Sequence, residues 1–118
     1  MISAEQAQHF AEDWIASWNA HDLARILAHY TADLSMTSPF IVQIAGEPSG
    51  TLKGREAVGA YWAKALERMP DLRFELMGVY RSMNSVVIHY RNQLGRIGAE
   101  SFQFDRDGFV HTAVAHYV

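Results

Sequence analysis

The sequence has no cysteine among its 118 residues, so disulfide bonds, thiolate catalysis and cysteine-type zinc sites are excluded. It has no basic run either: ten Lys and Arg are scattered among 13 Asp and Glu, and the net charge of −3 argues against a nucleic-acid partner. No apolar run approaches the roughly 20 residues that span a bilayer, and the first residues lack the pattern of a signal peptide. These absences predict a soluble, cytoplasmic protein with neither a membrane nor a nucleic-acid partner.

The composition is that of a globular protein, with 49% apolar and 19% charged residues. A chain of this length can bury a substantial core but is too short for two ordinary domains. No internal repeat, low-complexity tract or linker divides it. We therefore expect a single domain over residues 1–118.

Three segments show the three- and four-residue spacing of apolar side chains that is typical of amphipathic helices. They predict helices over about residues 4–19 and 55–68, and between them a short helix that carries Leu23, Ile26 and Leu27. Ser3 begins the first helix with a capping-box pattern, and Asp22 is placed to cap the second.

The remaining segments indicate strands and one loop. Residues 30–39 alternate as a strand does, and Pro39 ends that strand. Residues 40–54 contain three glycines and predict an apolar loop that covers something apolar. Four later strands are predicted at residues 72–81, 86–94, 97–105 and 109–118. Helices followed by an antiparallel meander are typical of an α+β fold, in which a curved sheet over helices leaves a conical cavity for a small molecule.

Four motifs, taken in order, resemble the SnoaL-like or nuclear transport factor 2-like superfamily, which includes polyketide cyclases and ketosteroid isomerase. The motifs are WNAHDLARILAHYTADLSMTSP, GREAVGAYW, ESFQFDRDG and AHY. The resemblance implies a cone-shaped barrel, in which a curved antiparallel sheet wraps around three N-terminal helices. It also implies a deep pocket, and a homodimer formed through the outer face of the sheet.

The first motif and its surroundings are similar to ketosteroid isomerase at three positions. Trp14 stands where that enzyme has an oxyanion-donating tyrosine, and Ser38, before Pro39, stands where it has its proton-shuttling aspartate. Glu100 stands where it has a protonated aspartic acid as second donor. A serine hydroxyl does not take up a proton near neutral pH without an activating base, so steroid isomerisation is not expected here.

A hairpin that turns on residues 95–96 predicts how two strands pair. In that register Arg91 lies across from Glu100, and His89 lies across from Phe102, all on the concave face. Arg91 and Glu100 then either orient a polar ligand while His89 handles a proton, or form a structural ion pair beside a core histidine. In either case the neighbouring guanidinium favours an ionised Glu100.

These arguments give a set of candidate site residues. His89 and Glu100 are the catalytic candidates, and the ligand-binding candidates are Trp14, Tyr30, Met36, Ser38, Trp62, Arg91 and Phe102. The aromatic members are either pocket walls or plain core. A buried indole N–H or phenol O–H would need a partner, which a ligand or water could supply. Ser38 either binds the ligand or caps the strand end.

Six histidines are present, but none forms a paired ligand pattern with another, so we expect neither a metal nor another cofactor. The last strand predicts a dimer surface. Thr112, Val114 and His116, together with Ile88 and Tyr90, are expected on the convex face of the sheet, where they would form a homodimer contact or a partly solvated surface.

Three functions remain open from the sequence. The first is a small-molecule enzyme of isomerase, cyclase, lyase or hydrolase type that uses acid–base residues in an aromatic pocket. The second is a module that binds a small apolar or carbonyl-containing molecule without turnover. The third is a dimeric interaction domain whose pocket is incidental.

Overall fold

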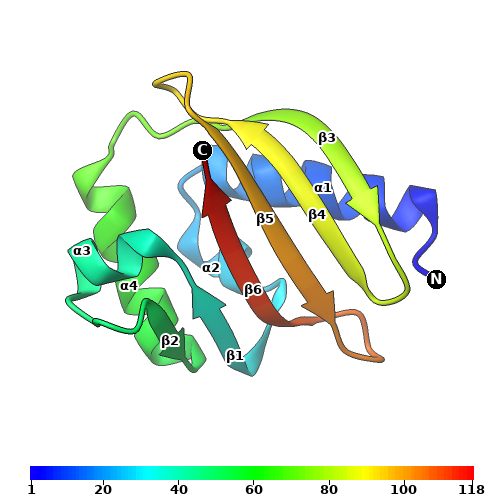
Figure 1. Cartoon of the computed structure of the whole chain (residues 1–118), viewed down its shortest axis with the longest axis horizontal. Coiled ribbons are helices and arrows are strands. Elements are labelled where there is room, and N and C mark those ends of the chain that lie inside the picture. Colours follow the sequence, from blue (N-terminus) through cyan, green and yellow to red (C-terminus); the bar gives the residue numbers. More distant parts are fainter.

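A computed structural model describes all 118 residues. The helices lie on one side of a curved, open sheet, and α1 crosses behind β3 and β4 in Figure 1. The elements are α1 (Ala4–Asn19), α2 (Leu23–Leu27), β1 (Tyr30–Thr37), α3 (Pro39–Ala45), β2 (Thr51–Lys53), α4 (Arg55–Arg68), β3 (Glu75–Arg81), β4 (Ser85–Arg91), β5 (Ile97–Phe104) and β6 (Val110–Tyr117). The predicted α+β class is confirmed.

The six strands follow the order β2-β1-β6-β5-β4-β3. The pairing of β1 with β6 is parallel, and every other pairing is antiparallel. The last four strands therefore form the predicted meander. β1 and β2 extend it on the side of β6, where α3 and α4 gather (Figure 1).

The three predicted helices are present, and α1 and α2 begin at the predicted local caps. Ser3 Oγ accepts a hydrogen bond from Gln6 N at 3.0 Å, and Ser3 N donates to Gln6 Oε1 at 3.1 Å, which completes the capping box of α1. Asp22 Oδ1 accepts from Arg25 N at 3.1 Å and caps α2. Between the two helices His21 has a φ of 53°, the left-handed conformation that a tight break requires.

Residues 40–54, predicted as a loop, instead contain α3 and β2, so that prediction is wrong. Pro39 is the first residue of α3, where a missing N–H costs nothing, and Ser38 Oγ accepts from Phe40 N at 3.2 Å. Gly46 ends the helix with a φ of 72°. A helix of under two turns with no charged face shows almost no periodicity in its sequence, and this is why it was missed.

The pairing of β4 with β5 differs from the predicted register, and the predicted Arg91–Glu100 pair is wrong. Arg91 lies across from Ile97, three residues before Glu100, and Glu100 lies across from Ile88. Because side chains alternate along a strand, a shift by an odd number of residues exchanges its two faces. Arg91 and His89 therefore lie on the outer face of the sheet, away from Glu100.

The loop between β4 and β5 explains the shift. It has five residues, 92–96, instead of a tight turn on Gly95 and Arg96. Asn92 Oδ1 accepts from Leu94 N at 2.9 Å and from Arg96 N at 3.0 Å, and Asn92 N donates to Arg96 O at 2.9 Å. One side chain thus closes the loop and sets the register of both strands.

With this register, β4 turns Val86, Ile88 and Tyr90 toward the helices, where all three are buried. The prediction that Ile88 and Tyr90 lie on the convex face is therefore wrong. They join an aromatic cluster in which Trp14 is central. Its ring stacks on Phe74 with a centroid distance of 5.6 Å and an angle of 5°. No helix of the structure is long and apolar enough to cross a membrane.

Candidate functional site

A cavity of about 210 Å³ lies between α1, α3, α4 and the concave face of β4 and β5. Fourteen of its 20 lining residues are hydrophobic, and none is a histidine. The lining residues are Trp14, Trp18, Met36, Ser38, Phe40, Ile44, Tyr61, Trp62, Ala65, Met69, Leu72, Phe74, Tyr90, Asn92, Gln93, Leu94, Arg96, Gly98, Glu100 and Tyr117. We call this the Glu100 cavity.

Glu100 is the one carboxyl group in this cavity. The residue is only 5% exposed, and its carboxyl group makes no hydrogen bond or ion pair with the protein. Its neighbours across the sheet, Ile88 and Ala115, are apolar. Burial raises the pKa of Glu100 to about 8, because the charged form loses its hydration. The carboxyl group is therefore mostly protonated at neutral pH, contrary to the expectation that rested on Arg91.

Two buried tyrosines bring hydroxyl groups to the same cavity. Burial, and after it the charge of Glu100, raises the pKa of Tyr90 well above its ordinary value. Burial also raises the pKa of Tyr61. Both hydroxyls thus keep their protons and can donate hydrogen bonds to a ligand. Tyr90 reaches across to Gly98, its partner in β5, where an added Cβ would lie 2.9 Å from the tyrosine hydroxyl.

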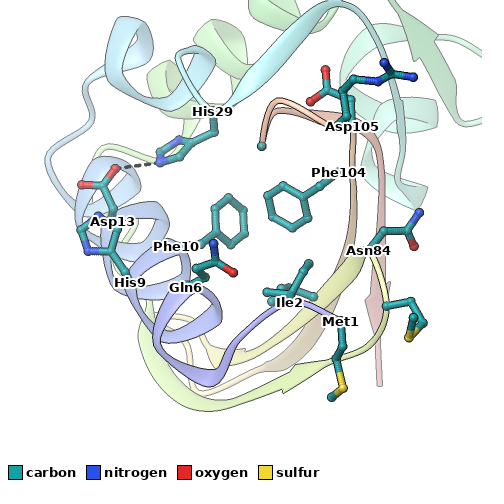
Figure 2. Close-up of a pocket in the computed structure, with 14 residues that line it drawn as sticks. Met1, Ile2, Gln6, His9, Phe10, Asp13, His29, Asn84, Phe104 and Asp105 are labelled. Carbon is teal, nitrogen blue, oxygen red and sulfur yellow. Dashed lines mark hydrogen bonds and ion pairs between the residues drawn. The ribbon is translucent and has the colours of Figure 1, made fainter.

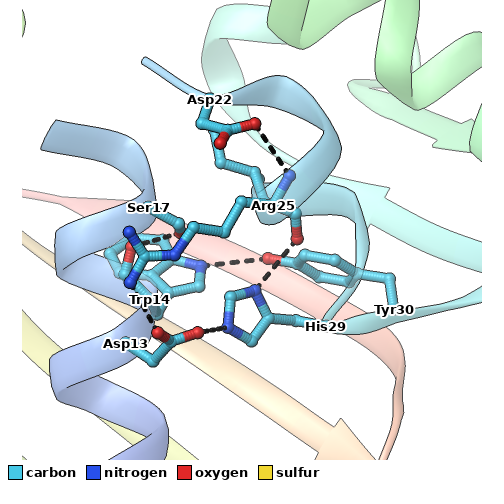
Figure 3. Close-up of polar contacts among 8 residues, drawn as sticks. Asp13, Trp14, Ser17, Asp22, Arg25, His29 and Tyr30 are labelled. Atoms are coloured by element: carbon cyan, nitrogen blue, oxygen red, sulfur yellow. Dashed lines mark hydrogen bonds and ion pairs between the residues drawn. The ribbon is translucent and has the colours of Figure 1, made fainter. Parts of the chain in front are cut away.

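The indole N–H of Trp14 and the hydroxyl of Tyr30 are hydrogen-bonded to each other, so neither group needs a ligand as its partner. Trp14 Nε1 donates to the Tyr30 hydroxyl at 3.0 Å, as Figure 3 shows. Trp14 lines the Glu100 cavity as an apolar wall, whereas Tyr30 lies behind it at 1% exposure. The Trp14 indole therefore has no free N–H to donate to a ligand.

The predicted site residues fall into three groups. Glu100, Trp14, Met36, Ser38 and Trp62 line the cavity. Two more, Tyr30 and Phe102, belong to the core behind its wall. The outer face of the sheet carries His89, whose ring lies 6.4 Å from that of Tyr80, and Arg91, whose Nη1 is 3.9 Å from Glu75 Oε2.

Tyr90 was predicted on the wrong face, and Phe74, Tyr117 and Arg96 line the cavity although they were not predicted as site residues. The error in the hairpin register caused the first miss. In the observed register Tyr90 lies opposite Gly98, and its ring fills the space of the missing side chain.

A second cavity, of about 520 Å³, lies at the other end of α1 and is more open (Figure 2). Phe10 and Phe104 form its floor, with a ring distance of 4.9 Å, and Asp13 and His29 stand at its edge. Phe102 separates the two cavities. Its ring lies 5.0 Å from Phe10 on one side and 5.3 Å from Trp14 on the other.

Of the two acids that line this second cavity, Asp13 and Asp105, Asp13 is fully paired. Asp13 Oδ1 accepts from Arg25 Nη2 at 2.7 Å, and Asp13 Oδ2 is 2.7 Å from His29 Nε2 (Figure 3). The hydrogen bond from Arg25, with a smaller contribution from His29, lowers the pKa of Asp13. No three His, Asp or Glu side chains converge as a metal site would require. The Glu100 cavity, with its unpaired acid, is therefore the candidate functional site.

Helices packed on the concave side of an open six-stranded sheet, with an aromatic cavity between them, define the nuclear transport factor 2-like class of folds. Within it, the chain belongs to the SnoaL-like family, because the SnoaL-like domain profile matches residues 11–116. It is similar to a SnoaL-like protein of unknown function from Burkholderia thailandensis, at 52% identity and a TM-score of 0.95 over 99% of this chain and 98% of that one.

Two more distant structures share the fold alone. A candidate isomerase of the SnoaL-like family from Agrobacterium tumefaciens is 18% identical, with a TM-score of 0.77 over 97% of this chain and 98% of that one. An NTF2-like protein of unknown function from Cytophaga hutchinsonii is 10% identical, with a TM-score of 0.71 over 100% and 92% of the two chains. A search of curated proteins gave no match.

Proposed function

We propose that the Glu100 cavity binds a small apolar molecule with a carbonyl group, and that Glu100 moves a proton on it in an isomerase- or cyclase-type reaction. One observation carries the proposal: a buried carboxyl group faces an aromatic cavity with no partner in the protein. An unpaired buried carboxyl group is costly to keep, and it is a frequent mark of a functional site.

The cavity suits a small ligand of this kind. Its volume of about 210 Å³ lies below the range typical of drug-sized ligands, which favours a compound of one or two rings. The walls are mainly aromatic, and the polar groups are few. Tyr90 and Tyr61 supply hydroxyl donors that could hold a carbonyl oxygen.

The proton step follows from the pKa of Glu100. A group with a pKa of about 8 is ionised in a minor fraction of molecules at neutral pH, and its carboxylate is a stronger base than an ordinary one. That carboxylate takes a proton from the carbon beside the carbonyl, the bond electrons move to the carbonyl oxygen, and a tyrosine hydroxyl stabilises the enolate. Glu100 then returns the proton to carbon. Activity is expected to rise with pH up to about 8.

Glu100→Gln tests the proton step, because the amide keeps the size and hydrogen bonding of the side chain but cannot shuttle a proton. We would follow exchange of the α-protons of 1-tetralone in D₂O by NMR. The wild type should speed the exchange, and Glu100→Gln should lose a factor of about 100 or more. Ser101→Ala is the matched control, since it changes the next residue on the outer face. Equal exchange by the wild type and Glu100→Gln would refute the reaction.

A non-catalytic binding module is the second candidate. Ser38, which stands at the position of the isomerase base, accepts a hydrogen bond at the start of α3, and no second carboxyl or imidazole group lines the cavity. In that case a protonated Glu100 only donates a hydrogen bond to the ligand. Ligand-induced thermal stabilisation of both the wild type and Glu100→Gln, without proton exchange in either, would favour this function.

We also propose a homodimer through the outer face of the sheet. With the corrected register this face presents Val87, Ala99 and Val114 together with His89, Arg91 and smaller polar residues, and the three apolar side chains are partly exposed. Val114→Glu should convert a dimer to a monomer in light scattering. A monomeric wild type would contradict the proposal.

A further inference from the structure

Arg96 stands at the mouth of the Glu100 cavity, in a loop whose backbone is fixed. The Asn92 carboxamide accepts from Arg96 N at 3.0 Å, and Arg96 O accepts from Asn92 N at 2.9 Å. The loop is also tied to the segment before β3, because Arg73 N donates to Gln93 Oε1 at 3.2 Å. The start of the Arg96 side chain is thus held in place, while the side chain itself is exposed and lines the cavity.

Arg96 is the only cationic residue that lines this cavity, and it has no carboxylate within ion-pair distance. Arg25 and Arg91, by contrast, are each paired with an acid. The lining therefore holds two ionisable groups of opposite kind, Arg96 at the mouth and Glu100 inside, and the two do not neutralise each other.

The strand geometry sets the separation of these two groups. Gly98 and Glu100 share the inner face of β5, and Arg96, the loop residue just before this strand, lines the same cavity. Four residues of extended chain span roughly 13 Å. Gly98 leaves no side chain between them, and the ring of Tyr90 covers its position. Along one wall of the cavity, from its mouth inward, lie the guanidinium of Arg96, the ring of Tyr90 and the carboxyl group of Glu100.

We propose that Arg96 binds a carboxylate at the far end of the ligand, so that lipophilic oxo-carboxylates bind more tightly than neutral ketones of the same shape. The inference rests on the proposed function of the cavity and deepens it. The carbonyl group lies at Glu100, an apolar body lies over Tyr90, and the carboxylate pairs with the guanidinium, which can bind it through two parallel N–H groups.

Isothermal titration with a homologous series of ω-oxo-ω-phenylalkanoic acids and their methyl esters tests this. In the wild type an acid of intermediate chain length should bind best, about fivefold more tightly than its ester at low salt, and added salt should reduce that difference. Arg96→Gln should abolish the advantage of the acid and leave the affinity for the ester unchanged. Arg91→Gln is the matched control, since it removes the same charge from the outer face of the same hairpin.

The outcomes separate this inference from the proposed function. Equal affinities for acid and ester in the wild type would overturn the role of Arg96, as would an equal loss in Arg91→Gln and Arg96→Gln. If ester binding still depended on Glu100 in either case, the proposed function of the cavity would survive. Failure of every acid and every ester to bind would overturn both. Circular dichroism should show an unchanged fold for both arginine variants, because both side chains are exposed.

Discussion

Asp13 and Glu100 each place a carboxyl group at one of the two cavities, and their surroundings shift the pKa values of these groups in opposite directions. The Asp13 side chain is 39% exposed and lies 2.7 Å from both Arg25 and His29, and its pKa is lowered. Glu100 is 5% exposed and has no partner, and its pKa is raised to about 8. The paired acid joins α1 to the segment after α2, whereas the unpaired acid remains available for chemistry. The presence of an acid at a cavity therefore says little until its partners are known.

Phe102 keeps the two cavities apart, so Phe102→Ala should have the largest effect. The side chain is fully buried between Phe10 and Trp14. Its loss should lower the free energy of unfolding by about 3–5 kcal/mol, measured by urea denaturation, because a large void replaces the ring. Phe104→Ala, at a partly exposed position, should cost less. Equal losses in the two variants would show that Phe102 is not the central contact.

The pH dependence of stability should distinguish the two acids. Because the pKa of Glu100 is raised in the folded protein, its contribution to stability is fully present below its ordinary pKa near 4.5 and is lost as the pH rises through about 8. Between these values the free energy of unfolding should fall by at most about 1.4 kcal/mol per pH unit. Glu100→Gln should remove this slope, as urea denaturation at several pH values would show. An unchanged slope in the variant would mean that Glu100 is not the group responsible.

The effect of Asp13 should be smaller and opposite in sign. Because its pKa is lowered in the folded protein, its stabilisation is present above its ordinary pKa and is lost as the pH falls through the lowered value. Asp13→Asn should cost about 1 kcal/mol or less at neutral pH, since solvent screens an exposed pair. Adding salt should reduce the difference between variant and wild type in thermal melts. A loss as large as that of Phe102→Ala would contradict this ranking.

Features that depend on neighbours in the sequence could be predicted, and those that depend on distant ones could not. The ends of α1 and α2 follow from Ser3 and Asp22, whose hydrogen bonds span three residues. The register of β4 and β5 depends on the five-residue loop that Asn92 closes. The same residues are also compatible with a tight turn on residues 95–96, which gives a different register. Glu100 was predicted as a site residue, but its protonation could not be, because that depends on whether Arg91 faces it.

The two roles of Ser38, as the N-cap of α3 and as a cavity residue, affect how the chemistry of this fold can change in evolution. Its hydroxyl caps α3 while the residue lines the Glu100 cavity. Aspartate caps helices about as well as serine does, so the position can exchange the two residues with little cost to α3. A single substitution can therefore add a second carboxyl group to the cavity, or remove one, while α3 keeps its N-cap. A cap of this kind lets a lineage gain or lose a proton-transfer group while folding remains under the same selection.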